Sequence, residues 1–514
     1  MVTQPVDFPL VKVARLRISP KQKRFRRRVF GVPGLPGAKT IVSHANTVGN
    51  AVRAARERVL GTVEDGVWHD TIQPTSDFAA RLGIVRRQVL RKCNRRALPI
   101  SVEEFALHYR GPKRKRYLTA MRNIDARGVC RRDADIRGFI KSEKWHEDKA
   151  GRIISPATPE YIAALGAYLQ PVEHNIYRAF EFATGSEVIM KGYTQEKRAA
   201  VIARHWGKFK NPIGIGLDAS KFDQHVSGKA LAFEHSFYRH IYFNDPQLSK
   251  MLSWQLERKV SMVLDDGVVK WKAKGGRMSG DINTALGNCI LSATMLLSYA
   301  RHRGVRVLIV VDGDDCVAFM EASDEAKFRA GLKEWYFELG FRMKVEPTAY
   351  RLNDVEFCQS KMVHDGEKWM LVRNPLKAIT QDHCWIERGG QRWDEVLGAT
   401  GYGGLAMYGN MPVLGAYYSM LMRCSDNPNP ARMDEHSWLR HLGAATDARR
   451  TEPTDACRVS FRDTFGIPIW LQTALEAEYD KFDLKSVAQS CYVNPLPTKF
   501  GDFQSATNIL LKYY

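Results

Sequence analysis

Residues 305–320 read VRVLIVVDGDDCVAFM. A mostly apolar, β-branched run leads into Asp312-Gly313-Asp314-Asp315, and a second apolar run follows at once, which is the pattern of a β-hairpin. Glycine at the turn accepts a positive φ and lets the backbone approach a ligand closely. Adjacent carboxylates raise each other's pKa unless a cation lies between them. The stretch therefore predicts either a solvated acidic turn or a cation site.

The composition indicates a polyanionic partner. The chain has 514 residues, with 77 Lys and Arg against 56 Asp and Glu, a formal net charge of +21. Such an excess favours nucleic acid or an anionic membrane surface. The nine cysteines are scattered without a CxxC pair. This spacing gives no support for a zinc ribbon and favours a reducing compartment over a disulfide framework.

No segment has the pattern of a signal peptide or a membrane span. The first residues lack an apolar h-region, and the longest apolar run, 285–300, is interrupted by polar residues and too short to cross a bilayer. We expect that the chain does not cross a membrane by itself, and that any attachment comes from a partner or from surface charge.

The first 110 residues are basic, with the densest runs at 21–28 (KQKRFRRR) and 86–96 (RRQVLRKCNRR). These runs predict either solvated faces or a surface that follows an RNA backbone. The glycine-rich stretch at 31–40 lacks the spacing of a phosphate-binding P-loop and is predicted to be a loop.

Residues 138–156 (GFIKSEKWHEDKAGRIISP) predict a β-ribbon. Lys141 and Lys144 lie on its first arm, and Arg152 lies at the start of its second arm. An ammonium and a guanidinium directed into one cleft could grip a triphosphate. An ordinary surface hairpin is the alternative.

Residues 213–224 (IGIGLDASKFDQ) predict a strand that ends at Asp218, followed by Asp223 and then a helix over 228–243. The carboxyl end of a strand is where α/β sites place metal ligands. Asp223 is equally well interpreted as a helix N-cap.

Residues 276–288 (GRMSGDINTALGN) predict a flexible turn at Ser279–Gly280 and the start of a long helix. Thr284 and Asn288 lie four residues apart and so share one helical face. They could line a cleft or be satisfied core residues.

Downstream of the hairpin, the periodicity predicts a helix over 324–339 that stops at Gly340. The segment 340–344 follows, and a short strand and turn are predicted at 356–360. Beyond about residue 376 the chain is predicted to be mainly helical, with GYGG (401–404) and DNPNP (426–430) as breakers.

The order of these features resembles a viral RNA-dependent RNA polymerase, over roughly residues 109–466. The segments GFIKSEK, GRIISPATPEYIAALGAYLQPVEH, GRMSGDINTALGN, GDDCV, EFCQSKMVHDGEKWMLVRNPLKAIT and VSFRDTFGI are similar to tombusvirus-like polymerases, including umbravirus-like relatives. Asp312 stands where such enzymes vary.

The resemblance implies an α+β right-hand fold. It divides the chain into a basic extension at 1–110 that contacts fingers and thumb, interleaved fingers and palm at 111–375, and a mostly helical thumb and C-terminal region at 376–514. The palm is expected to be an antiparallel sheet flanked by helices.

The resemblance also implies roles for individual residues, in a two-metal-ion nucleotidyl transfer with Mg²⁺ or Mn²⁺. Asp218, Asp314 and Asp315 are expected to bind the metals, and Lys344 to act as general acid for pyrophosphate. NTP contacts are expected from Lys141, Lys144, Arg152, Asp223, Ser279, Gly280, Thr284 and Asn288. Primer or product contacts are expected from Phe357, Cys358 and Gln359.

The implied partners are a single-stranded RNA template, nascent RNA, NTPs and a membrane-anchored viral replication protein that recruits the enzyme to replication complexes in the host cytoplasm. A reverse transcriptase shares the carboxylates but usually has a bulky residue in place of Asp223 and no counterpart of Asn288. A basic capsid or nucleoprotein would explain the charge but not the ordered carboxylates.

Overall fold

The computed structural model describes residues 15–18, 27, 29–32, 35, 41–64, 67–94, 97–386, 392–426 and 448–484, with backbone alone at 15–18 and 64. The basic run at 21–28, the loop predicted at 31–40 and the breaker at 426–430 lie largely outside the described residues.

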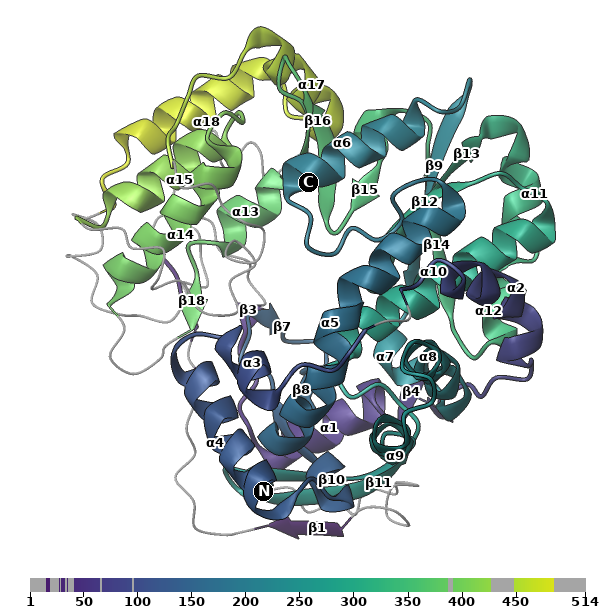
Figure 1. The fold of residues 1–514 in the computed structure, drawn as a ribbon. Coiled ribbons are helices and arrows are strands. Elements are labelled where there is room, and N and C mark those ends of the chain that lie inside the picture. The colour runs from purple at the N-terminus through teal and green to yellow at the C-terminus, as the bar shows by residue number, and fades with distance from the viewer. Residues whose placement is uncertain are drawn as a thin grey trace.

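A four-stranded antiparallel sheet in the order β12-β13-β9-β14 carries the segment that opened the sequence analysis (Figure 1). Its strands are β9 (Pro212–Ala219), β12 (Leu308–Asp312), β13 (Asp315–Glu321) and β14 (Met343–Ala349). The β12–β13 pair confirms the predicted hairpin, with Gly313 at φ 75° in its turn. The strand predicted to end at Asp218 is confirmed as β9, which runs one residue further.

Both faces of this sheet are buried, which explains why the hairpin sequence is apolar without alternation. One face, with Ile215, Val311 and Ala318, packs against the core that includes α8 (Gly228–Ile241) and α10 (Thr284–Arg303). The other face, with Val310 and Phe319, packs against α6 (Gln195–Trp206) and a three-stranded sheet. That sheet contains β15 (Glu356–Phe357), β16 (Ser360–His364) and β17 (Trp369–Arg373).

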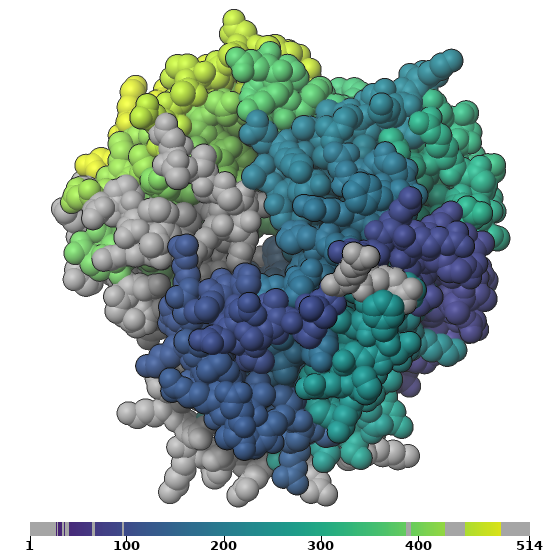
Figure 2. All heavy atoms as spheres, in the orientation of Figure 1, coloured from purple at the N-terminus to yellow at the C-terminus, as the bar shows by residue number. Residues whose placement is uncertain are grey.

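A second, five-stranded sheet in the order β1-β11-β10-β6-β8 lies at the bottom of Figure 1. Its strands are β1 (Arg15–Ile18), β6 (Ile136–Ile140), β8 (Ile153–Ile154), β10 (Glu257–Leu264) and β11 (Gly267–Lys274). The pairing of β6 with β8 forms the ribbon predicted from 138–156. In Figure 2 the near face is hollowed at its centre, above the blue segment that contains α3 (Val102–Leu107) and α4 (Gly111–Arg127).

The C-terminal part is mainly helical, as predicted, and has its own apolar core. Its helices are α13 (Pro375–Gln381), α14 (Trp393–Tyr408), α15 (Leu414–Arg423), α17 (Asp455–Phe465) and α18 (Ile469–Lys481). In Figure 1 these helices form the upper left of the molecule.

Segments from the first 110 residues are distributed over the molecule. Strand β2 (Val29–Phe30) pairs with β18 (Trp385–Ile386), and β3 (Ile41–Val42) pairs with β7 (Trp145–His146).

The remaining elements are α1 (Val48–Arg58), β4 (Gly61–Glu64), β5 (Val67–Asp70), α2 (Phe78–Leu90), η2 (Arg131–Ala134), α5 (Pro159–Thr184), α7 (Phe222–His225), α9 (Pro246–Trp254), η3 (Ala322–Asp324), α11 (Glu325–Arg329), α12 (Leu332–Glu338) and η4 (Leu352–Asp354). Within the described part of the chain, no helix is both long and apolar enough to span a membrane.

Two sequence predictions about helices were wrong. The helix predicted over 324–339 is two helices, α11 and α12, because Gly331 adopts φ 79° between them. The GYGG stretch does not break a helix but lies inside α14, where its glycines permit close packing on α15. A Cβ on Gly404 would lie 2.1 Å from the ring of Tyr418, and one on Gly401 would lie 2.3 Å from the Met422 nitrogen.

We predict that Gly404→Ala lowers the free energy of unfolding by about 1–3 kcal/mol, because the added methyl group overpacks the helix contact. Chemical denaturation measures the loss. The matched control is Gly49→Ala in α1, where an added Cβ would have nothing within 4 Å. This control should be neutral or stabilise by up to about 1 kcal/mol, and equal effects of the two variants would contradict the packing argument.

Candidate active site

The strand register places acidic residues from three separate strands side by side. Asp315 on β13 lies directly opposite Asp218 on β9, and Asp218 lies opposite Lys344 on β14. Asp312 lies opposite Asp315 across the hairpin. Directly opposed residues project from the same face of a sheet, so one row crosses all four strands at the end that carries the Gly313 turn.

Two carboxylates at this end of the sheet, those of Asp314 and Asp315, have raised pKa values. Burial, followed by the charges of Asp314, Asp312 and Asp218, raises the pKa of Asp315 to about 7. Burial also raises the pKa of Asp314, with further contributions from Asp223, Asp218 and Asp312. Both residues are nevertheless exposed to solvent. Within the described residues, no Lys or Arg forms an ion pair with Asp218, Asp314 or Asp315.

A cavity of about 980 Å³ opens beside the turn. Asp314 lines it together with eight other residues singled out from the sequence: Lys141, Arg152, Asp223, Ser279, Gly280, Thr284, Asn288 and Asp312. Its wall is otherwise strongly basic, with Arg58, Lys113, Lys191, Lys221, Lys272, Lys274 and Arg277. The cavity therefore joins an acidic edge to a wall that suits a polyanionic ligand.

The β6–β8 ribbon presents two cations to this cavity. The Lys141 amide donates to the Arg152 carbonyl at 2.8 Å, which sets the two residues opposite each other. Both side chains pair with Glu143, Lys141 at 3.0 Å. Burial acts to raise the pKa of Glu143, but the hydrogen bond and charge of Arg152 and the charge of Lys141 outweigh it and lower that pKa. Glu143 thus remains an anion that holds both cations at the cavity.

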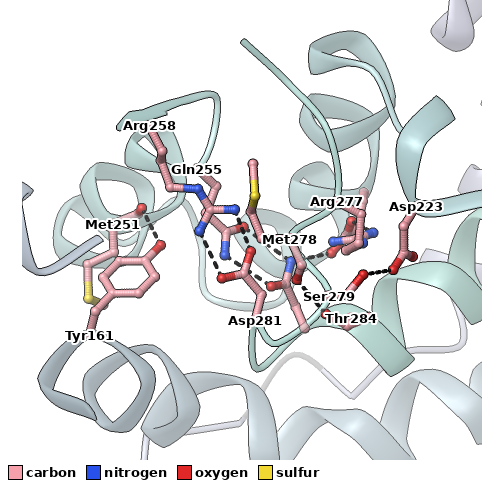
Figure 3. A network of polar contacts seen from close by, with 12 residues as sticks. Tyr161, Asp223, Met251, Gln255, Arg258, Arg277, Met278, Ser279, Asp281 and Thr284 are labelled. Atoms are coloured by element: carbon pink, nitrogen blue, oxygen red, sulfur yellow. Dashed lines mark hydrogen bonds and ion pairs between the residues drawn. The ribbon is translucent and has the colours of Figure 1, made fainter. Parts of the chain in front are cut away.

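Asp223 is held by two side chains, that of Ser279 from the turn (Figure 3) and that of Asn288 from the long helix. Asn288 Nδ2 donates to Asp223 Oδ1 at 2.8 Å, and the Ser279 hydroxyl donates to Asp223 Oδ2. Thr284 lies one turn before Asn288 on α10, and its hydroxyl donates to the Met278 carbonyl at 3.1 Å. Asp223 lies in the first turn of α7 and is not its N-cap, which is Lys221.

Gly280 fits a position that other residues would strain. Its φ is 149°, and a Cβ would lie 2.9 Å from the Pro156 nitrogen. The Ser155 amide donates to the Ser279 carbonyl at 2.9 Å. The turn is therefore pressed against the chain that follows β8, and it connects the Asp223 group to the ribbon.

Other predicted site residues lie outside the cavity lining. Phe357 is buried, and Cys358 and Gln359 form the left-handed turn between β15 and β16, at φ 51° and 60°. Cys358 lies near enough to Asp315 to lower the pKa of that carboxyl, so this turn adjoins the acidic row. Lys344 is exposed and adjoins the row through its register.

The structure does not support Lys144 as a triphosphate ligand. Its ammonium donates to the carbonyls of Gln381 and Cys384 at 2.5 and 2.8 Å. Burial is the largest cause that lowers its pKa. Lys144 instead ties the ribbon to the end of α13, a contact between segments far apart in sequence that no local pattern reveals.

Sequence reasoning missed a buried polar network behind Asp223. Arg277 Nε donates to Asn288 Oδ1 at 3.0 Å, and Arg277 pairs with Glu234, both with 0% exposed side chains. Arg258 pairs with Asp281 at 2.5 Å, with side chains 1% and 2% exposed (Figure 3). Glu234 could have indicated this network, because its spacing places it on the apolar face of its helix with Leu231 and Tyr238. A carboxylate buried on such a face needs a basic or hydrogen-bonding partner.

The donor set suits a hard divalent cation, because Asp218, Asp314 and Asp315 offer carboxylate oxygens as ligands. Across the described ranges, no three acidic, His or Cys side chains are grouped closely enough to hold a metal by themselves. Mg²⁺ is usually bound by one or two carboxylates together with substrate phosphates and water. The raised pKa values and missing basic partners of Asp314 and Asp315 fit such an arrangement.

Comparison with known proteins identifies the family. A family model described as viral RNA dependent RNA polymerase matches residues 16–487. The RNA-directed RNA polymerase of Oat chlorotic stunt virus (isolate United Kingdom) is 35% identical over 94% of this chain and 67% of that protein. Those of Turnip crinkle virus and Tomato bushy stunt virus (strain Cherry) are 34% and 33% identical, over 93% and 92% of this chain and 62% and 58% of those proteins.

The chain spans 58% to 67% of the length of these three relatives. They confirm the resemblance to tombusvirus-like polymerases that the motifs indicated. The chain therefore belongs to the family of viral RNA-dependent RNA polymerases.

Proposed function

We propose that this chain catalyses template-directed synthesis of RNA from NTPs, by two-metal-ion nucleotidyl transfer, in replication of a positive-strand RNA virus genome. The observation that carries the proposal is the register of Asp315 against Asp218 beside a cavity with basic walls. Membership of the polymerase family supports the same chemistry. In the proposed right-hand arrangement, the four-stranded sheet is the palm, the five-stranded sheet belongs to the fingers, and the helices after residue 376 form the thumb.

Asp218, Asp314 and Asp315 would hold Mg²⁺ or Mn²⁺. When bound, the two ions neutralise charge on the attacking 3′-hydroxyl, the triphosphate and the leaving pyrophosphate. Lys141 and Arg152 bind the triphosphate by exchanging Glu143 for phosphate oxygens, and the Arg152 guanidinium can do so bidentately. Lys344, next to Asp218 in register, donates a proton to the leaving pyrophosphate.

Asp223 and Asn288 recognise the ribose 2′-hydroxyl of the incoming nucleotide, with Thr284 in support. Their mutual hydrogen bond fixes both side chains at the cavity. A site that hydrogen-bonds a hydroxyl disfavours the analogue that lacks it, because its polar groups then lose their partner. Ser279–Gly280 adjusts as template and product advance, and Phe357, Cys358 and Gln359 contact the primer or product strand.

Recruitment is a further part of the proposal. Through a membrane-anchored viral replication protein, the chain would act at membrane-associated replication complexes in the host cytoplasm. The resemblance to tombusvirus-like polymerases supports this, and the net charge of +21 suits a nucleic-acid partner.

The direct test is incubation with an RNA template, labelled NTPs and Mg²⁺ or Mn²⁺, scored for template-length product. We predict that Asp314→Asn reduces incorporation by at least about 100-fold, since a metal ligand is lost, while RNA binding is retained. Asp125→Asn on the exposed face of α4 is the matched control. Equal loss of RNA binding and incorporation would make Asp314 a structural residue.

We predict that Asp223→Ala and Asn288→Ala each reduce the preference for NTP over dNTP by at least about tenfold. The ratio of kcat/KM for the two substrates measures this and does not depend on the fraction of folded enzyme. Ser298→Ala, on α10 outside this cavity, should leave the ratio unchanged. Unaltered discrimination in both variants would remove the 2′-hydroxyl assignment.

The raised pKa of Asp315 predicts a pH-dependent stability change. With a pKa of about 7 in the folded chain and ~3.9 when unfolded, the folded state binds more protons between these values, so the charged carboxylate costs stability above pH 7 and not below pH 4. In metal-free buffer, Asp315→Asn should raise the thermal unfolding midpoint at pH 8, and the gain should shrink towards pH 5.

The control for this measurement is Glu147→Gln, at an exposed loop carboxylate that forms no ion pair with any described residue. Its effect should not follow the same pH course. A gain of the same size at pH 5 and pH 8 for Asp315→Asn would contradict the electrostatic origin.

A further inference from the structure

Asp312 belongs to the acidic row, and its carboxylate already forms ion pairs with two basic side chains. Its side chain is 10% exposed at the end of β12. Lys191 Nζ lies 3.3 Å from one carboxylate oxygen, and Arg198 Nη2 lies 2.5 Å from the other. Asp312 therefore differs from Asp218, Asp314 and Asp315, for which the structure gives no basic partner among the described residues.

Arg198 also reaches the turn between β15 and β16. Its Nη1 lies 3.7 Å from Cys358 Sγ, and Cys358 in turn lies near enough to Asp315 to lower the pKa of that carboxyl. Because Asp312 and Asp315 are cross-strand partners, the four residues close a ring: Asp312, Arg198, Cys358 and Asp315. We call this ring the Asp312 clasp. In this ring, the Cys358 side chain lies between the Arg198 guanidinium and Asp315, a proposed metal ligand.

The backbone keeps both cations near the hairpin. The Met190 amide donates to the Val311 carbonyl at 2.8 Å, and the Val311 amide donates to the Val188 carbonyl at 2.8 Å. Residue 189 forms a parallel bridge with Val311. Arg198 Nε donates to the Tyr193 carbonyl at 3.1 Å, and its side chain is only 7% exposed. The Arg198 guanidinium cannot leave the neighbourhood of the turn without breaking its contacts, whereas only the backbone at Lys191 is held there.

Two basic side chains beside a carboxylate pair can compete with a metal ion for the carboxylate oxygens. A guanidinium or ammonium that is not otherwise paired forms a charge-assisted bond with a nearby carboxylate. Such a bond on Asp315 would occupy oxygens that a divalent cation needs. Asp312 prevents this, because its two oxygens engage one cation each.

We propose that Asp312 is a positioning residue which engages Arg198 and Lys191 and so keeps Asp315 open to a divalent cation. The inference rests on the proposed metal role of Asp315 and adds a residue that acts on the metal site through other side chains. Loss of the Asp312 charge is expected to release Arg198 to Asp315, along the path that Cys358 now occupies.

The test measures Mn²⁺ binding by electron paramagnetic resonance of the free ion, on the full chain without RNA or NTP. Asp312→Asn should weaken binding by about tenfold or more, as expected when a residue that supports metal ligands is changed. The double variant Asp312→Asn/Arg198→Met should bind within about threefold of the unaltered chain, because the competing cation is gone. Arg198→Met alone should also stay within about threefold.

Each other outcome overturns the proposal. If Asp312→Asn binds Mn²⁺ normally, no competition exists. If the double variant binds as weakly as Asp312→Asn, Asp312 is a metal ligand or a purely structural residue. Thermal unfolding of each variant shows whether the fold is kept.

If Asp312→Asn does not fold, Asp312→Glu and Lys191→Met supply the test. The first retains the charge and should keep Mn²⁺ binding, and the second removes a cation whose side chain is 43% exposed and should leave binding equal or tighter. Weaker binding in either variant overturns the proposal. If the unaltered chain binds Mn²⁺ but makes no RNA, the proposed function fails while the Asp312 inference stands.

Discussion

Repulsion between carboxylates fixed at the end of one sheet is the constraint on which the site depends. Like charges directly opposite each other in a sheet cost up to about 1 kcal/mol. The same strands bury Val310, Ile215 and Phe319 completely, and each such side chain contributes about 1.5–3 kcal/mol. Apolar burial on both faces therefore outweighs the repulsion, and the sheet holds the acidic residues together where isolated strands would separate.

A second constraint fixes Asp223 relative to this row. Arg277 and Glu234 are fully buried as an ion pair, and Arg277 also bonds to Asn288. Buried ion pairs give little net stability, because desolvation offsets the attraction. Their value here is geometric. Arg277 holds the Asn288 side chain, and Asn288 in turn holds the Asp223 carboxylate in one orientation at the cavity. Discrimination by a single hydroxyl group requires such a fixed orientation.

The sequence could predict those parts of the molecule whose signal is local. The hairpin at Gly313, the strand that carries Asp218 and the ribbon at Lys141 all follow from short-range periodicity and turn residues. The glycines of α14 were misread as helix breakers. Glycine is needed at Gly404 because the ring of Tyr418, on another helix, leaves no room for a side chain. Lys144 was misplaced for the same reason, since the carbonyls that it bonds lie some 240 residues away. Long-range packing has no period that a single sequence can show.

Two acidic residues at the edges of the site each hold a pair of cations, and their different burial separates their roles. Glu143 binds Lys141 and Arg152, whose side chains are 32% and 41% exposed, so water and phosphate can reach both cations. Asp312 binds Arg198, whose side chain is 7% exposed and bonded to backbone as well. A triphosphate can therefore replace Glu143 on its cations, whereas no ligand of that size can reach Arg198. The Glu143 pair is therefore suited to exchange during binding, whereas the buried Arg198 on Asp312 is suited to keeping its charge in one place.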